Sequence, residues 1–139
     1  MSLSAISKAI RKQVVVRDRG YCQYCGLRQR GQAAIFHIDH IVPKSKGGRT
    51  EPANLALQCT HCSLHKSDKV AAMDPATNDV VALFHPLQQQ WHEHFAVEPN
   101  GTCRGLTPTG RATVDALGMN EMHPRSARAI QIRLGLLAL

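Results

Sequence analysis

Apolar residues recur along the chain at spacings that predict both helices and strands. Residues 4–18 place Ile6, Ile10 and Val14 on one face of a helix, with Ser4 as a candidate N-terminal cap. Residues 32–42 are rich in β-branched side chains and stop at a proline, which predicts a strand. The first third of the chain is therefore expected to form a helix followed by a strand.

The pattern continues with a short second strand and a further helix. Residues 54–58 (NLALQ) predict an extended segment, and residues 63–73 predict a helix. Further along, Asn100-Gly101 is a typical hairpin turn. Three more strands are predicted, over residues 80–84, 95–97 and 102–106.

Two helices are predicted in the last third of the chain. Thr107 can cap the first of them and Pro108 suits its first position, so this helix is expected to run to Leu117. The second covers residues 125–137, and we expect its apolar stripe to pack against the hairpin. A homodimer through this C-terminal helix is the alternative. The stripe consists of Ala127, Ile130, Leu134 and Leu137.

These elements predict an α+β protein with two parts. Residues 1–73 would form a small core with an N-terminal helix, and residues 74–139 an extension that packs on or beside it. The net charge of +7 is unevenly divided between the halves. Residues 1–70 hold 12 Lys/Arg against 4 Asp/Glu, whereas residues 71–139 hold 5 against 6. A polyanionic partner is therefore expected on the first half.

Four of the five cysteines form two Cys-x-x-Cys pairs, Cys22/Cys25 and Cys59/Cys62. Four thiolates can surround Zn²⁺ as a tetrahedron, and such a filled site is structural because no position is left for water. We see no secretory signal and no apolar run long enough to span a bilayer, so we expect a cytoplasmic protein without a membrane partner. In that compartment the thiols stay reduced and favour zinc over disulfides.

The segment between the two cysteine pairs resembles the HNH endonucleases, whose shared core is a ββα-metal hairpin and helix. The residues that match the family pattern are Cys22, Cys25, Asp39, His40, Ile41, Pro43, Gly47, Gly48, Asn54, Leu55, Cys59, Cys62 and Lys66. Phosphodiester hydrolysis needs an activated water and a cation that neutralises charge, and a neutral histidine can take the proton of that water.

The resemblance implies a role for three residues of this chain. His40 would be the general base, and Asp39 a ligand of a catalytic Mg²⁺ or Mn²⁺ ion. Asn54 would hold the hairpin by bonding backbone near His40, although a plain turn role is nearly as well supported. Strand alternation would point Asp39 and His40 to opposite faces unless local twist intervenes.

The chain departs from the family at Ser63, where a second metal ligand, asparagine or histidine, is usual. We expect Ser63 to act directly or through a water. His37, two residues before Asp39, and His65, on the following helix, are the possible substitutes.

Nucleic acid is the predicted partner, with double-stranded DNA the usual substrate of the family. Basic side chains on phosphates predict salt-sensitive binding with little sequence specificity. The alternative function is a zinc-stabilised nucleic-acid-binding module without cleavage. The candidate contacts are Lys44, Lys46, Arg49, Lys66 and Lys69.

Overall fold

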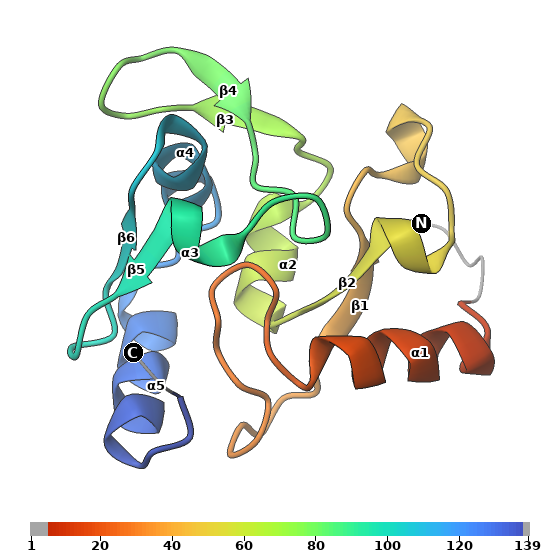
Figure 1. The fold of residues 1–139 in the computed structure, drawn as a ribbon, viewed down its shortest axis with the longest axis horizontal. Helices are drawn as coiled ribbons and strands as arrows, with labels where there is room; N and C mark the ends of the chain where they lie inside the picture. Colours follow the sequence, from red (N-terminus) through yellow and green to blue (C-terminus); the bar gives the residue numbers. More distant parts are fainter. Residues whose placement is uncertain (1–5, 138–139) are drawn as a thin grey trace.

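The structure is a computed structural model that describes residues 6–137 (Figure 1). It combines helices with three separate two-stranded antiparallel sheets, which gives the α+β class that the sequence predicted. Among the helices of this described part, none combines the length and apolarity that a membrane span requires.

The first helix, α1 (Lys8–Asp18), starts later than the predicted 4–18, so Ile6 precedes it, and of the predicted face Ile10 is only partly buried. Val14 is fully buried, and the Ser7 hydroxyl caps the helix by accepting from the Ile10 amide at 3.2 Å. The predicted cap, Ser4, lies outside the described residues. Asp18 ties this helix to the next layer, because its buried carboxylate accepts from the Leu57 amide at 2.9 Å.

Strands β1 (His37–His40) and β2 (Leu55–Gln58) form an antiparallel hairpin in which His40 pairs with Leu55. Two 3-10 turns, η1 (Lys44–Lys46) and η2 (Pro52–Asn54), lie in the connection between them. Strand β1 is shorter than the predicted strand over 32–42, because β2 offers only four partner residues before Cys59 caps the next helix.

The helix predicted over 63–73 was wrong at both ends. Helix α2 (Thr60–Lys66) starts at the Cys59 cap and stops at Ser67, whose φ of 50° leaves the helical region. The residues beyond it form β3 (Ala71–Met73), which pairs with β4 (Val80–Ala82). Pairing with a distant strand therefore overrides the local helical pattern here.

The C-terminal part contains the predicted β5 (Phe95–Val97) and β6 (Cys103–Gly105), preceded by a short helix α3 (Trp91–His94) that the sequence did not indicate. Helix α4 (Pro108–Ala116) follows, and the Thr107 hydroxyl caps it by accepting from the Gly110 amide at 3.0 Å. That cap is the one predicted.

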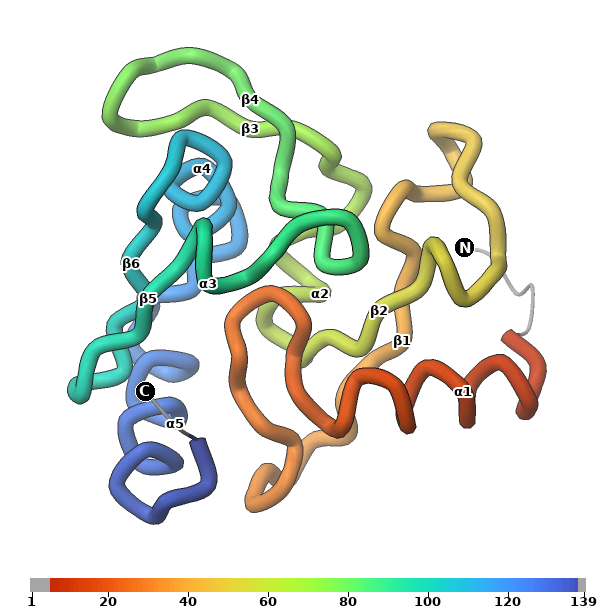
Figure 2. The backbone as a smooth tube through the Cα atoms, in the orientation of Figure 1, coloured from red at the N-terminus to blue at the C-terminus, as the bar shows by residue number. Residues whose placement is uncertain are grey.

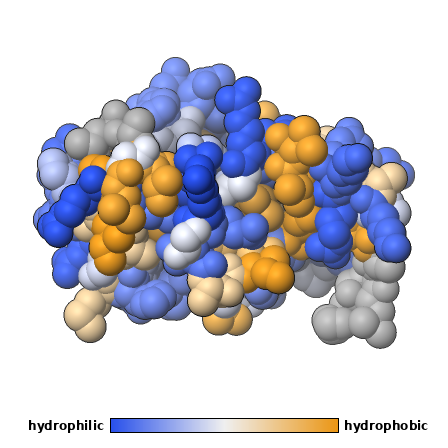
Figure 3. All heavy atoms as spheres, turned by 90° about the horizontal axis from the view of Figure 1, so that it is seen from below, coloured by the Kyte–Doolittle hydropathy of each residue, from blue (hydrophilic) through white to orange (hydrophobic). Residues whose placement is uncertain are grey.

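The last helix, α5 (Met122–Arg133), starts and ends earlier than the predicted 125–137, and only part of its apolar stripe packs, with Ala127 against the core cluster. Ile130 is 56% exposed and Leu134 67%, whereas Arg128 and Gln131 are buried. The polar side chains can be buried because backbone groups satisfy them; the Gln131 amide, for example, bonds to the Arg28 amide and carbonyl. On the face seen in Figure 3, apolar side chains lie in separate groups among hydrophilic ones. A homodimer through α5 stays a prediction.

One hydrophobic core joins the two halves of the described chain. Helix α2 lies between the β1–β2 hairpin and the C-terminal elements (Figure 2). The core cluster takes in the cysteines and Leu57 from the first half, and Phe84, Phe95, Leu117 and Met119 from the second. Residues of both halves thus share one core, and the division of the chain into a core over 1–73 and an extension over 74–139 stays a prediction.

Candidate functional site

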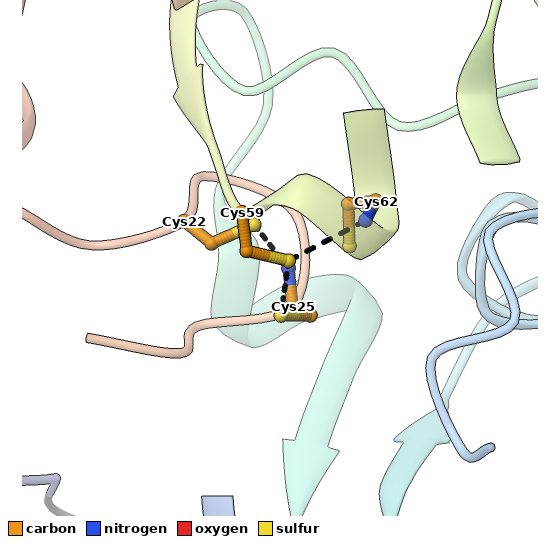
Figure 4. Close-up of side chains that lie close together, drawn as sticks. All are labelled: Cys22, Cys25, Cys59 and Cys62. Carbon is orange, nitrogen blue, oxygen red and sulfur yellow. Dashed lines mark hydrogen bonds between the residues drawn. The ribbon is translucent and has the colours of Figure 1, made fainter. Parts of the chain in front are cut away.

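The four paired cysteines converge, as Figure 4 shows. Cys22 and Cys25 come from the loop after α1, and Cys59 and Cys62 from the start of α2. Their sulfur atoms all lie within 4.8 Å of one another, and all four side chains are buried. The Cys25 and Cys59 sulfurs are 3.8 Å apart, which is roughly the edge of a tetrahedron with Zn–S bonds of about 2.3 Å. The residues present therefore fit a structural zinc ion.

Cys103 stands apart from this cluster. It is buried in β6, and burial raises the pKa of its thiol to about 12. A thiol with so high a pKa is a poor nucleophile. Cys103 therefore contributes packing and not a fifth ligand.

His40 and Asp39 lie side by side at the end of β1. The His40 Nδ1 atom is 4.0 Å from Asp39 Oδ1, and its Nε2 atom is 2.8 Å from the Thr50 hydroxyl. The imidazole is 13% exposed, and burial lowers the pKa of His40, followed by an opposing effect of Asp39. A pKa below the usual value of 6.5 leaves the ring neutral at pH 7.

The Asp39 carboxylate is more open, with 44% of the side chain exposed. Its Oδ1 accepts from the His40 amide at 2.9 Å, and its Oδ2 from the Ser63 hydroxyl at 3.1 Å. Strand alternation alone would separate Asp39 from His40, but β1 ends at His40 and the two side chains come within 4 Å. Helix α2 thus brings Ser63 to the carboxylate.

The Asn54 side chain bonds to backbone close to His40. Its side chain donates to the carbonyls of Val42 and Arg49 and accepts from the Val42 amide, each at 2.9 Å. Gly48 permits this arrangement, because a Cβ there would lie 1.7 Å from the Val42 carbonyl oxygen and 2.8 Å from Asn54 Nδ2. The contribution of Asn54 to catalysis stays a prediction.

Lys66 differs from the expected phosphate contact. It is only 2% exposed, and its ammonium donates to the carbonyls of Ile41 at 2.8 Å and His40 at 3.4 Å. Burial lowers the pKa of Lys66. The lysine therefore connects α2 to the end of β1 and does not face solvent.

The remaining candidates occupy different surroundings. Lys44, Lys46 and Arg49 are exposed around the glycine turn, as is Lys69 beyond α2. His37 is exposed at the start of β1. His65 faces Glu121 with its Nε2 atom, 3.3 Å from Oε2, on the side of α2 away from Ser63.

The segment that holds the two cysteine pairs and the Asp-His strand was compared with known protein families. Residues 22–69 match the HNH endonuclease family. The HNH segment spans about a third of the chain and holds all four clustered cysteines, Asp39, His40 and Asn54. The resemblance read from the sequence is thereby confirmed. Comparisons with curated proteins and with solved structures found no significant match.

Thr50 is the site residue that the sequence did not reveal. Its hydroxyl is the hydrogen-bond partner of His40 Nε2, although it lies ten residues away in the loop before η2. No spacing or motif marks a threonine in such a loop. Only the path of the loop around the glycine turn of the HNH segment brings it to the imidazole.

Proposed function

We propose that the chain is a metal-dependent endonuclease that hydrolyses phosphodiester bonds of DNA. Double-stranded DNA is the proposed substrate. The observation that carries this is a neutral, mostly buried imidazole beside an accessible carboxylate within the HNH segment. A base held neutral at pH 7 can accept a proton, and an accessible carboxylate can bind a divalent cation.

In this proposal His40 takes the proton of the attacking water. In the tautomer that this role requires, Nε2 donates to the Thr50 hydroxyl 2.8 Å away, and Nδ1, on the Asp39 side, carries the lone pair. A divalent cation such as Mg²⁺ or Mn²⁺ would be held by Asp39, with Ser63 acting directly or through a water. When bound, it supplies neutralisation of charge on the phosphate and leaving oxygen.

Asn54 and Lys66 serve as positioning residues. Both bond to backbone within two residues of His40: Asn54 at Val42, and Lys66 at Ile41 and at His40 itself. Their bonds fix the end of β1 against the glycine turn and against α2. The imidazole is thereby held at one angle to the carboxylate, which favours catalysis by orientation.

The nucleic-acid backbone would lie across the exposed basic residues of the first half. Lys44, Lys46 and Arg49 surround the turn next to His40, and Lys69 follows α2. Side chains of this kind neutralise phosphates without reading bases, so binding is expected to weaken steeply with salt. The second half, with a net charge near zero, adds little to this attraction.

The test is plasmid cleavage by the zinc-loaded chain, with and without Mg²⁺ or Mn²⁺. We expect metal-dependent nicking or linearisation that falls about 10²- to 10⁴-fold in His40→Ala, the usual loss for a missing general base. His92→Ala, which removes an exposed histidine elsewhere, is the matched control and should cut normally. Equal cleavage by His40→Ala and the wild type would refute the assigned role.

A second function, nucleic-acid binding without cleavage, is favoured by one observation. Ser63 donates to Asp39 from the position where the family usually supplies a stronger metal ligand. Under this alternative no cation supports cleavage, yet DNA binding is salt-sensitive and unchanged in His40→Ala. Ser63→Asn distinguishes the two, because restoring the usual ligand should increase cation-dependent cleavage only if the remaining machinery is competent.

A further inference from the structure

A second group of metal-ligand side chains lies where α2 meets the turn before α5. His61 and His65 are one helical turn apart on α2, and Glu121 precedes the first residue of α5. One ligand atom from each lies within 4.8 Å of the other two. We propose that these three residues bind a divalent transition-metal ion, separate from both the cysteine cluster and the Asp39 site.

The distances suit such an ion. His65 Nε2 is 3.3 Å from Glu121 Oε2, and two ligands at about 2.0–2.1 Å from a tetrahedral ion lie roughly 3.3–3.4 Å apart. His61 Nε2 is 3.9 Å from Glu121 Oε1, and it completes a three-ligand arrangement once it exchanges its hydrogen bond to the Gly118 carbonyl for the ion. Histidines at i and i+4 of a helix are a common chelating pair.

The hydrogen bonds around His65 leave its Nε2 available. Its Nδ1 is 2.9 Å from the His61 carbonyl oxygen, which can only accept, so Nδ1 carries a proton. In the neutral ring Nε2 then has its lone pair facing a carboxylate oxygen at 3.3 Å. Two acceptors at this distance need a cation between them, either a proton or a metal. A backbone carbonyl on the other ring nitrogen is the usual outer contact of a metal-bound histidine.

Gly118 provides the space for this convergence. A Cβ at this position would lie 2.2 Å from Glu121 Oε2 and 3.1 Å from His61 Nε2. The Gly118 carbonyl also accepts from His61 Nε2 at 2.9 Å, so an ion at this nitrogen would replace that hydrogen bond and the ring proton would move to Nδ1. The stacked imidazoles of His61 and His65, with centroids 4.0 Å apart, present their edges to the same carboxylate.

The chemistry of the three ligands selects the kind of ion. Two imidazoles and one carboxylate favour Zn²⁺, Ni²⁺ or Cu²⁺ over Mg²⁺, which prefers oxygen ligands. The side chains are 18%, 37% and 58% exposed for His61, His65 and Glu121, so an ion can enter and keep at least one water. A bound ion would connect the helix of the HNH segment to the C-terminal extension.

Isothermal titration with Ni²⁺ tests the proposal on the full chain, loaded with one zinc and kept in excess Mg²⁺. We expect one equivalent of Ni²⁺ to bind, with affinity at least about tenfold weaker in His65→Ala and in Glu121→Gln, since even an outer-contact change typically costs that much. His92→Ala should bind as the wild type does. Zinc content should stay at one per chain throughout, which excludes exchange at the cysteines.

Three results would overturn the proposal: no Ni²⁺ binding by the wild type, unchanged binding in both site variants, or an equal loss in His92→Ala. The measurement does not depend on cleavage. Failure of the nuclease proposal would therefore leave this site intact, and the reverse holds as well.

Discussion

At the scale of single residues, Thr50 is the hydrogen-bond partner of the proposed base, His40. Its hydroxyl lies 2.8 Å from Nε2, so the ring presents Nδ1 toward Asp39. Because the imidazole is only 13% exposed, water molecules can make few contacts that would hold its orientation. A neutral base with the wrong tautomer or angle cannot accept the proton of a bound water. Thr50 is therefore a positioning residue for the proposed reaction.

We predict that Thr50→Val lowers kcat roughly ten- to a hundredfold with little change in KM, as expected for a misoriented base. The base must be neutral, so the rate falls as pH drops through the His40 pKa, which burial already places below 6.5. Valine removes an acceptor that favours the charged ring, which should lower that pKa further and move the acidic limb to lower pH.

Rate–pH profiles of cleavage check this prediction, with Thr50→Ser as the control that keeps the hydroxyl. Serine should retain most of the rate and the wild-type acidic limb. If valine and serine variants have the same profile, Thr50 has a packing role only.

At the scale of elements, the sequence predicted those features that depend on neighbouring residues in the chain. The β1–β2 hairpin, the cysteine pairs and the Thr107 cap follow from spacing, β-branched residues and capping chemistry. The helix ending at 73 was wrong because β4 captures residues 71–73 as a strand. The burial of Lys66 was not predictable either, since it depends on carbonyls of β1 that only the packed hairpin presents to α2.

The burial of Arg128 in helix α5 was likewise not predictable from the sequence. This side chain is fully buried, and it donates to the carbonyls of Gly101 and Met119, while its Nη1 atom has no hydrogen-bond partner among the described residues. No carboxylate in the described part of the chain, residues 6–137, forms an ion pair with Arg128. The pKa of Cys25 is held down first by the neighbouring cysteines and also by the charge of Arg128. A zinc ion with four thiolates carries net charge −2 and would be the counter-charge.

We therefore predict that Arg128→Met weakens zinc affinity roughly tenfold or more, the size of effect typical of outer contacts to a metal site. Competition with a chromophoric chelator measures the affinity. Arg133→Met, which removes an exposed arginine from the same helix, is the control and should leave zinc binding unchanged. Unchanged affinity in Arg128→Met would show that the guanidinium serves its carbonyl partners alone.

At the scale of the whole molecule, the cysteine cluster lies inside the core that both halves share. The cluster of buried residues contains the four zinc-site cysteines together with Phe84, Phe95 and Leu117 from beyond residue 73. Trp91 adds a direct bond, because its indole nitrogen donates to the Tyr24 carbonyl at 2.8 Å, between the two cysteines of the first pair. The metal site is thus a junction between the halves and not a feature of the HNH segment alone.

Zinc removal is accordingly predicted to unfold both halves together. A structural zinc contributes about 10–16 kcal/mol in small domains, which is comparable to the whole free energy of unfolding of a typical domain, about 5–15 kcal/mol. Hydrogen exchange after chelation should show loss of amide protection in α4 and β5–β6 at the same chelator concentration as in β1–β2. Cys103→Ser, which leaves the four clustered cysteines intact, should need as much chelator as the wild type. Amide protection that persists in residues 74–139 would mean that the extension folds as an independent unit. The packing of Phe84 and Phe95 against the cysteine cluster would then be a contact between two domains.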